Sequence, residues 1–231
     1  MDCDFKQANI VFTCLSNDKA VDDVYSTISA VGNIDGKLFV DCLTIHPISS
    51  EKVAKLVTDS GASFVASPVF GAPPMAEAGQ LVFVCAGPKA AVQRLRPYTN
   101  GVMGKAEVPM EDEPYGMAST MKIIGNTFVL NMVTQLGEAF TLPEKTGVGA
   151  ARVKSFVDGL FGGLYIPYDN AKKDAGHAEK LAKVAGMEVK NATTARQYLE
   201  ESADHVGGAK GDVASIYGAA RMKAGLKYEN N

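Results

Sequence analysis

The stretch Asn9-Ile10-Val11-Phe12-Thr13-Cys14-Leu15 decides the fold class of this chain. It is a short, nearly continuous apolar run, which is typical of a β-strand buried on both faces. The residues that follow, Ser16-Asn17-Asp18, are good helix N-caps, and a helix is predicted from Ala20 to Val31, with Gly32 just beyond it. A buried strand followed at once by a helix is the repeating unit of an α/β fold.

The same alternation continues through the first hundred residues. Further strands are predicted at 37–42, 63–69 and 81–85, and further helices at 51–59 and 88–95. Strands that alternate with helices need crossover connections, so we expect a mostly parallel sheet with helices on its faces.

After about residue 108 the strand-like runs disappear and helical patterns replace them. Three acids and a proline at Glu111–Pro114 mark a helix start. A long helix is predicted over 115–142, ended by Pro143, with one buried stripe formed by Met121, Ile124, Phe128, Met132 and Leu136. Shorter helices are predicted at 150–160, 171–185, 194–205 and 212–224. We therefore expect an α/β domain over residues 1–110 and an all-helical domain over residues 111–231.

Composition excludes several classes of protein. The 231 residues are 46% hydrophobic and 21% charged, as in ordinary globular proteins. The net charge of −3, without a basic surplus, disfavours a nucleic-acid partner. No apolar run is long enough to cross a membrane, and the acidic start MDCDFKQ is unlike a signal peptide, so we expect a cytoplasmic protein. The cysteines and histidines have no metal-ligand spacing, and no metal is expected.

Ligands of a parallel sheet bind at the carboxyl ends of its strands. The loops at that edge are predicted at 16–17, 43–46 and 70–74. A dinucleotide site would also use a G-x-G-x-x-G turn after a first strand. The sequence has no such turn; Gly147–Arg152 is the nearest match, and it lacks the third glycine and lies between two predicted helices.

Six segments in one order match the motifs of a known family. They are Ala8–Leu15 (a fourth Rossmann strand), Asp41–Pro47 (D-x-S-T-x-x-P), Ala66–Leu81 (D-A-P-V-S-G-G…A…G-x-L), Gly116 with Lys122 and Asn126 (G-x-x-x-x-x-K-x-x-N-N), Lys173-Asp174 (K-D) and Gly211–Ser215 (G-x-D-x-S-A). In these segments the chain resembles the β-hydroxyacid dehydrogenases, a family related to 6-phosphogluconate dehydrogenase and the imine reductases.

The resemblance implies an NADP- or NAD-dependent oxidoreductase, of the 3-hydroxyacid dehydrogenase type, that acts on a small molecule and forms a homodimer through its helical domain. In that family the lysine at the position of Lys122 exchanges the hydroxyl proton during hydride transfer, and Asn126 would orient the reacting oxygen. A fixed cation there stabilises the oxygen as it gains charge, and proton transfer is most efficient when burial lowers the pKa of the lysine toward neutrality. The expected cofactor contacts are Leu15, Ser16, Thr44 and Lys173, and the expected substrate contacts are Phe70, Gly71 and Ala72.

The chain also departs from the family pattern. It begins at the family's fourth strand, so we expect a truncated Rossmann-like domain without the glycine-rich part and with an exposed edge at residues 9–15 that a partner covers. Leu43 and Phe70 replace serines and Gly125 replaces an asparagine, which favours an apolar substrate over a carboxylate. Two alternatives stay open: a pseudoenzyme kept for its dimer surface, or a lyase or cyclase that uses Lys122 as an acid–base group or an imine-forming amine.

Overall fold

The computed structural model describes residues 7–31, 34–161, 171–184, 186, 190–206 and 215–229. The chain divides into two compact units, Met1–Ile123 and Ile124–Asn231, here called the sheet unit and the helical unit. The division falls inside a long helix rather than near residue 110, because the first turns of that helix pack on the core of the sheet unit: Ala118 belongs to this core, and Tyr115 and Met121 pack against it.

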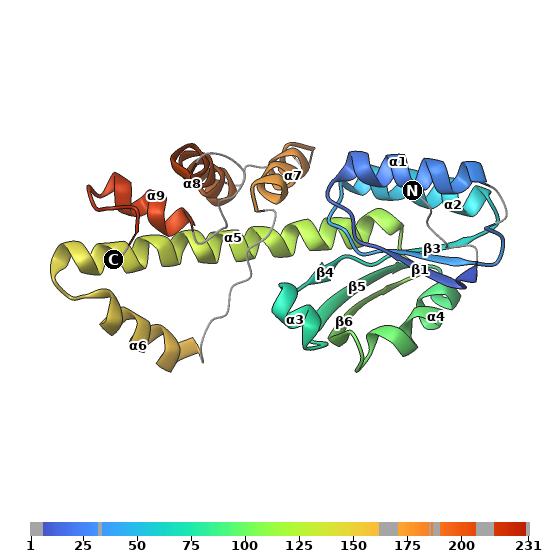
Figure 1. Ribbon diagram of the computed structural model, residues 1–231, viewed down its shortest axis with the longest axis horizontal. Helices are drawn as coiled ribbons and strands as arrows, with labels where there is room; N and C mark the ends of the chain where they lie inside the picture. The colour runs from blue at the N-terminus through green and yellow to red at the C-terminus, as the bar shows by residue number, and fades with distance from the viewer. Residues whose placement is uncertain are drawn as a thin grey trace. The chain divides into compact units, whose positions relative to one another are not determined.

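The sheet unit alternates strands and helices, as its hydrophobic pattern predicts (Figure 1). Its elements are β1 (Ile10–Thr13), α1 (Asp18–Val31), β2 (Leu38–Asp41), α2 (Pro47–Asp59), β3 (Ser63–Ala66), β4 (Val69–Phe70), α3 (Pro73–Glu77), β5 (Leu81–Gly87), α4 (Lys89–Thr99) and β6 (Gly104–Glu111). The strand β6 was not predicted. Its sequence GKAEVPME mixes charges with a proline, and it pairs only with β5 among the described strands.

The strands form one six-stranded sheet in the order β1-β2-β3-β5-β4, with β6 also paired to β5. The pairs β1–β2, β2–β3 and β5–β6 are parallel. The pairs β3–β5 and β4–β5 are antiparallel, because only the five-residue helix α3 lies between β4 and β5 and no long crossover helix returns the chain. Within the described residues β1 pairs only with β2 and forms one end of the sheet.

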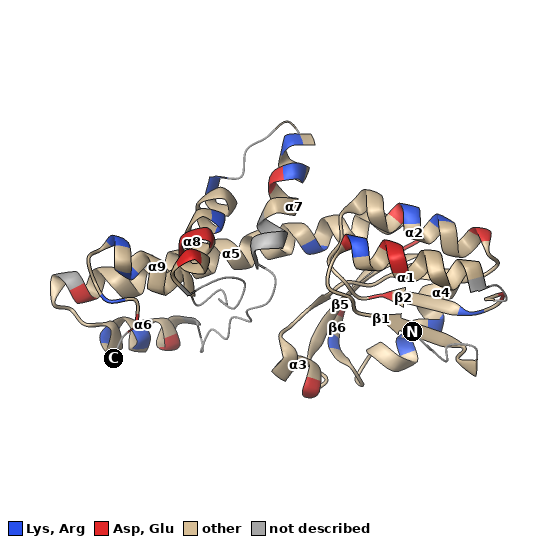
Figure 2. Cartoon of the chain, turned by 45° about the horizontal axis from the view of Figure 1, so that its top comes forward, with Lys and Arg blue, Asp and Glu red and all other residues tan. Residues whose placement is uncertain are grey.

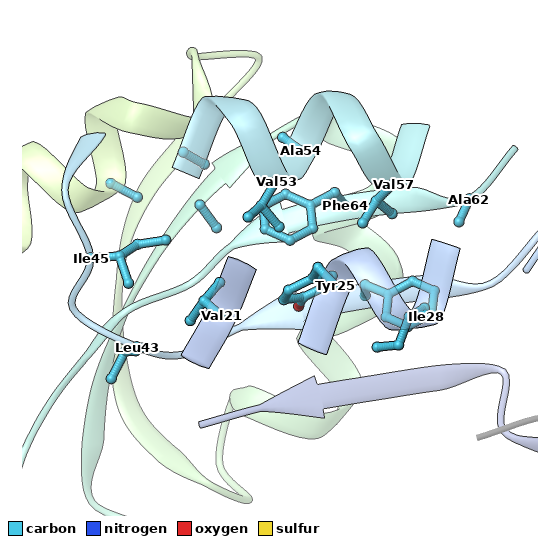
Figure 3. Close-up of a cluster of buried hydrophobic side chains, with 14 of the residues drawn as sticks. Val21, Tyr25, Ile28, Leu43, Ile45, Val53, Ala54, Val57, Ala62 and Phe64 are labelled. Carbon is cyan, nitrogen blue, oxygen red and sulfur yellow. The ribbon is translucent and has the colours of Figure 1, made fainter. Parts of the chain in front are cut away.

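Helices cover both faces of this sheet. On one face, Val21 and Tyr25 of α1 and Val53 of α2 pack against Phe64 of β3 (Figure 3). Phe39 of β2 belongs to the same cluster. On the other face, Leu95 of α4 packs with Leu38, Val40, Val65 and Phe83. Burial on both sides explains the continuous apolar run of β2, whose four residues are all buried. β1 was expected to be buried in the same way, but it lies at one end of the described sheet and is only partly covered, with Phe12 39% exposed.

The helical unit contains the greater part of α5 (Tyr115–Thr146), with α6 (Ala150–Phe161), α7 (Ala171–Val184), α8 (Lys190–Val206) and α9 (Ser215–Lys223). Its described core joins three of them: Leu130 and Val133 of α5, Leu199 of α8 and Ile216 of α9. The fold class predicted from the sequence, an α/β sheet domain followed by helices, is confirmed.

Two details of α5 differ from the prediction. The helix continues through Pro143, which is buried, and ends at Thr146, although a proline inside a helix removes a hydrogen bond and crowds the preceding turn. The proposed stripe is not buried throughout: Ile124 is 53% and Phe128 70% exposed. Ile123, Leu130 and Val133 are the buried residues instead, so the core face of the helix is rotated from the one the sequence suggested.

Surface charges of both signs are interspersed. Red and blue residues alternate on α1 and α2 (Figure 2), where Lys19 pairs with Asp23 and Lys52 pairs with Asp22 of the neighbouring helix. Within the described part of the chain, every helix is too short or too polar to cross a membrane.

Candidate active site

The carboxyl ends of β1 and β2 lie side by side and form one edge of the sheet unit. The Cys42 N–H donates a hydrogen bond to the Thr13 carbonyl oxygen at 2.8 Å, which extends the parallel ladder past the last strand residues. The His46 N–H donates to the Asp18 carboxylate at 2.9 Å, so the loop after β2 is tied to the first residue of α1. The two loops that the sequence marks as candidate ligand loops are therefore held together.

Two helices begin at this edge with side-chain caps. The Asn17 side-chain oxygen accepts from the Ala20 N–H at 2.9 Å at the start of α1. The His46 Nδ1 accepts from the Ile48 N–H at 3.3 Å at the start of α2. Helix starts present backbone N–H groups and a positive dipole end, which suit negatively charged ligand groups.

Three of the residues predicted to contact the cofactor lie at this edge. Ser16 is exposed, Leu15 is half-buried against the sheet core, and Thr44 is buried. The fourth, Lys173, lies in α7, and its side chain is outside the described residues.

Beneath this edge lies a buried polar network that the sequence reasoning missed. The Thr13 hydroxyl donates to the Asp41 carboxylate at 2.9 Å and hydrogen-bonds the Tyr25 hydroxyl at 2.8 Å. Burial, and secondarily the charge of Asp41, raises the pKa of Tyr25 well above its ordinary value, so this phenol stays protonated. The network ties the ends of β1 and β2 to α1. No short sequence motif marks it, because its members come from three separate elements.

Lys122 is buried in the sheet unit, with 8% of its surface exposed. Its Nζ lies over the Phe70 ring, 4.0 Å from the ring centroid. Such a contact between an ammonium and an aromatic face stabilises the cation by about 0.5 to 2 kcal/mol. The structure thus brings together the predicted proton-transfer residue and the first residue of the predicted substrate loop.

The start of α5 fixes the position of Lys122. The Glu51 carboxylate of α2 accepts a hydrogen bond from the Gly116 N–H at 2.7 Å. A Cβ at Gly116 would lie 3.0 Å from the Pro47 carbonyl oxygen, so the absence of a side chain lets the two helices approach this closely. Lys122 follows on the same helix, less than two turns later.

The predicted substrate loop is closely packed around Phe70. Phe70 pairs with Val82 of β5, and the next residue, Gly71, has a φ of 140°, which disfavours any residue with a side chain. A Cβ at Gly71 would come within 2.6 Å of the Leu81 side chain. Ala72 is buried and precedes α3. Asn126 follows Lys122 by one turn of α5 and belongs to the helical unit.

The comparisons with known proteins agree with this architecture. Residues 4–108 match a family model described as the NAD binding domain of 6-phosphogluconate dehydrogenase. The chain is 30% identical over 240 residues to the NADH-dependent oxidoreductase ucdB of Aspergillus ustus, covering 96% of this chain and 80% of that protein. The chain belongs to the β-hydroxyacid dehydrogenase family. Other curated relatives match over a shorter part, and the chain spans 30% to 55% of their length.

Solved structures show the same fold. The 3-hydroxyisobutyrate dehydrogenase of Mycobacterium tuberculosis, solved with L-serine, has a TM-score of 0.76 at 22% identity, covering 93% of this chain and 80% of that one. The structure titled Psf3 in complex with NADP+ and 2-OPP has a TM-score of 0.75 at 19% identity, covering 92% and 80%. The family, the oxidoreductase class and the NAD(P) cofactor class that the sequence predicted are confirmed.

The edge formed by β1 and β2 fits a nicotinamide dinucleotide. The exposed Ser16 hydroxyl lies at this edge and can donate a hydrogen bond to a phosphate or ribose oxygen, and the positive dipole ends of α1 and α2 favour negative charge there. Among the described residues, no three histidine, cysteine or acidic side chains are grouped as metal ligands would be.

Proposed function

We propose that Lys122 is the proton donor and acceptor in a reversible hydride transfer between NAD(P) and a small carbonyl or hydroxy compound. The observation that carries this proposal is the burial of the Lys122 ammonium against the Phe70 ring. A lysine is rarely buried to this extent without a specific partner. An ammonium fixed in a low-dielectric site stabilises a developing alkoxide far better than one in water does.

In the direction of reduction, the carbonyl carbon gains a hydride and the electron pair of the C=O π bond moves to oxygen. The reduced nicotinamide supplies that hydride and becomes oxidised. Lys122 donates one proton to the oxygen, which becomes the hydroxyl group of the product, and the lysine amine then regains a proton from water. In the direction of oxidation the same amine accepts the hydroxyl proton.

Asn126 stands four residues after Lys122, the spacing that places two side chains on one face of a helix. We propose that its amide donates a hydrogen bond to the same reacting oxygen. Leu15, Ser16 and Thr44 would contact the cofactor at the β1–β2 edge, and Lys173 would contact it from α7.

The test compares Lys122→Met with Lys55→Met, which removes an exposed lysine of α2 paired with Asp59. We expect Lys122→Met to lower kcat at least 100-fold, because general acid–base catalysis typically contributes 10²–10⁴-fold. Lys55→Met should match the unmodified chain. Lys122→Met should still bind the cofactor, which is measured as the rise in melting temperature on adding NADH or NADPH. Unchanged turnover in Lys122→Met would refute the role of the lysine.

The nucleotide and the assembly are also proposals. The relative from Aspergillus ustus is named as NADH-dependent, whereas the solved relative Psf3 holds NADP+. Titration with both nucleotides decides which one this chain prefers. We further propose that the chain acts in the cytoplasm as a homodimer. The dimer is supported by exposed apolar side chains on α5 and α6, such as Phe128, Phe156 and Leu160.

A further inference from the structure

We propose that Phe70 positions the Lys122 ammonium and selects a substrate whose reacting carbon carries apolar groups rather than a carboxylate. This inference rests on the proposed function of Lys122 and adds a role for the ring beside it. It is carried by the contact between the Lys122 Nζ and the ring face, at 4.0 Å from the centroid.

The ring is held by the backbone on which it stands. Phe70 and the preceding Val69 pair with Val82 and Phe83 of β5, so this two-residue strand is fixed to the middle of the sheet. Phe70 also packs against the buried cluster that contains Ala118 of α5. Both the ring and the helix that carries Lys122 therefore belong to one packed core.

The ring face is the electron-rich side of an aromatic group, and it attracts the ammonium without forming a hydrogen bond. An ammonium has three N–H donors, and the ring occupies one direction of approach. A single carbonyl oxygen needs only one N–H of the lysine. The contact therefore orients the ammonium and is compatible with proton donation to a ketone oxygen.

A carboxylate next to the reacting carbon has different requirements. Its two oxygens need several hydrogen-bond donors once water is removed. The Phe70 side chain has no donor, and its face repels negative charge. An alkyl or aryl group in the same place gains contact with the ring and requires no donor. The ring itself thus favours ketones with apolar substituents over 2-oxo acids, while the Lys122 ammonium is engaged by the reacting oxygen.

Specificity is tested with two substrates that differ only in one group on the carbonyl carbon, a methyl group in one and a carboxylate in the other. We would measure the reduction of 1-phenylpropan-2-one and of phenylpyruvate with NADH and NADPH. Hydride is added to the carbonyl carbon in both, the nicotinamide is oxidised, and the oxygen takes up one proton. We expect kcat/KM to favour the ketone at least tenfold, and Phe70→Ser to reduce this ratio at least tenfold. A preference for phenylpyruvate, absence of ketone turnover, or an unchanged ratio in Phe70→Ser would overturn the specificity role.

Positioning is tested without turnover, by competitive acetylation of the folded chain followed by peptide mass spectrometry. Phe70→Leu keeps an apolar side chain but removes the ring, and Phe70→Tyr keeps the ring. We expect Lys122 to be acetylated at least threefold faster in Phe70→Leu and within twofold of the unmodified chain in Phe70→Tyr. Exposed Lys55 is the internal reference.

Equal acetylation of Lys122 in all three folded proteins would overturn the positioning role. The acetylation result stands whether or not Lys122 transfers a proton. If Lys122→Met keeps full turnover while Phe70→Leu still exposes Lys122, the proposed function fails and the positioning role survives. If Lys122→Met abolishes turnover, while Phe70→Leu leaves the acetylation of Lys122 unchanged and Phe70→Ser leaves the substrate ratio unchanged, only the role of Phe70 fails.

Discussion

The carboxylate of Glu51, on α2, accepts a hydrogen bond from the backbone N–H of Gly116 at the start of α5. The first N–H groups of a helix have no partner within the helix, and a negative charge near them is stabilised by the helix dipole. One side chain therefore joins the helix that follows β2 to the helix that carries Lys122. It anchors the end of α5 on which the candidate site depends.

Replacing Glu51 by Ala should lower the free energy of unfolding by about 1 kcal/mol, because a charge-assisted hydrogen bond at the surface is lost. Urea denaturation followed by circular dichroism measures the difference. Glu77→Ala, which alters an exposed glutamate of α3, is the matched control and should be neutral. Equal stability of the two variants would show that the Gly116 contact does not stabilise the fold.

The buried network at the ends of β1 and β2 gives a second prediction. Thr13→Val removes the hydroxyl that bonds both Asp41 and Tyr25, so two buried polar groups lose a partner. We expect Thr13→Val to lower the free energy of unfolding by about 1 to 3 kcal/mol. Tyr25→Phe removes only one of these bonds and should cost about 1 kcal/mol. Chemical denaturation of both variants shows which one loses more free energy of unfolding. A larger loss in Tyr25→Phe than in Thr13→Val would contradict this description of the network.

The sequence predicted most of the fold because its strands and helices have clear periodicity and caps. β1, α1, β2 and α2 lie where the apolar runs and the N-cap residues indicated. β6 was missed because an edge strand with Lys105, Glu107 and Pro109 lacks a continuous apolar run. The buried face of α5 was misjudged because the helix has apolar residues on several sides, including both Ile123 and Ile124.

Prediction of the site was limited by distance along the chain. Phe70 and Lys122 were both identified from motifs, but their contact depends on how α5 packs against the sheet. The role of Glu51 was not predicted, because its hydrogen-bond partner Gly116 is 65 residues away in the sequence. Local patterns reveal residues of a suitable type, whereas contacts between distant elements are determined by the tertiary packing.

The cysteines should differ sharply in reactivity. Cys14 is exposed, whereas burial raises the pKa of the Cys85 thiol to about 11 and that of Cys42 still further, with the charge of Asp41 as a second cause. In a Cys3→Ser chain at pH 8, a disulfide reagent should therefore release one equivalent of thiol rapidly, from Cys14. The other two should react only after unfolding, because thiolates are the reactive form. Rapid release of three equivalents from the folded chain would contradict the raised thiol pKa values of Cys42 and Cys85.

In the helical unit, Glu144 of α5 pairs with Arg221 of α9 and accepts a hydrogen bond from the Tyr217 hydroxyl at 2.6 Å. This hydrogen bond, together with the Arg221 guanidinium, lowers the pKa of Glu144. A carboxylate whose pKa is lower in the folded state than in the unfolded state stabilises the fold above the unfolded value, about 4.3, and this contribution is lost as the pH falls.

Glu144→Gln should therefore reduce stability by about 1 to 2 kcal/mol at pH 7. It should also weaken the loss of stability between pH 6 and pH 3, because the substituted amide does not titrate. Denaturation at several pH values measures both effects. Parallel pH profiles for the two chains would show that Glu144 does not contribute to the acid sensitivity.

Several apolar side chains of α5 and α6 are exposed. Ile124 and Phe128 are four residues apart on α5, and Phe156 and Leu160 have the same spacing on α6, so each pair lies on one face of its helix. Exposed apolar pairs of this kind are costly in water and mark interaction surfaces. If they form the contact between two copies, sedimentation equilibrium should give twice the chain mass of 24.4 kDa.

Phe128→Asp should weaken dimerisation at least tenfold, because the charge would be buried in the interface without a partner. Val102→Asp, at an exposed apolar residue of the sheet unit, should leave the dimer intact. A monomer at micromolar concentration, or a dimer that Phe128→Asp does not weaken, would contradict the proposal that these side chains form the dimer contact.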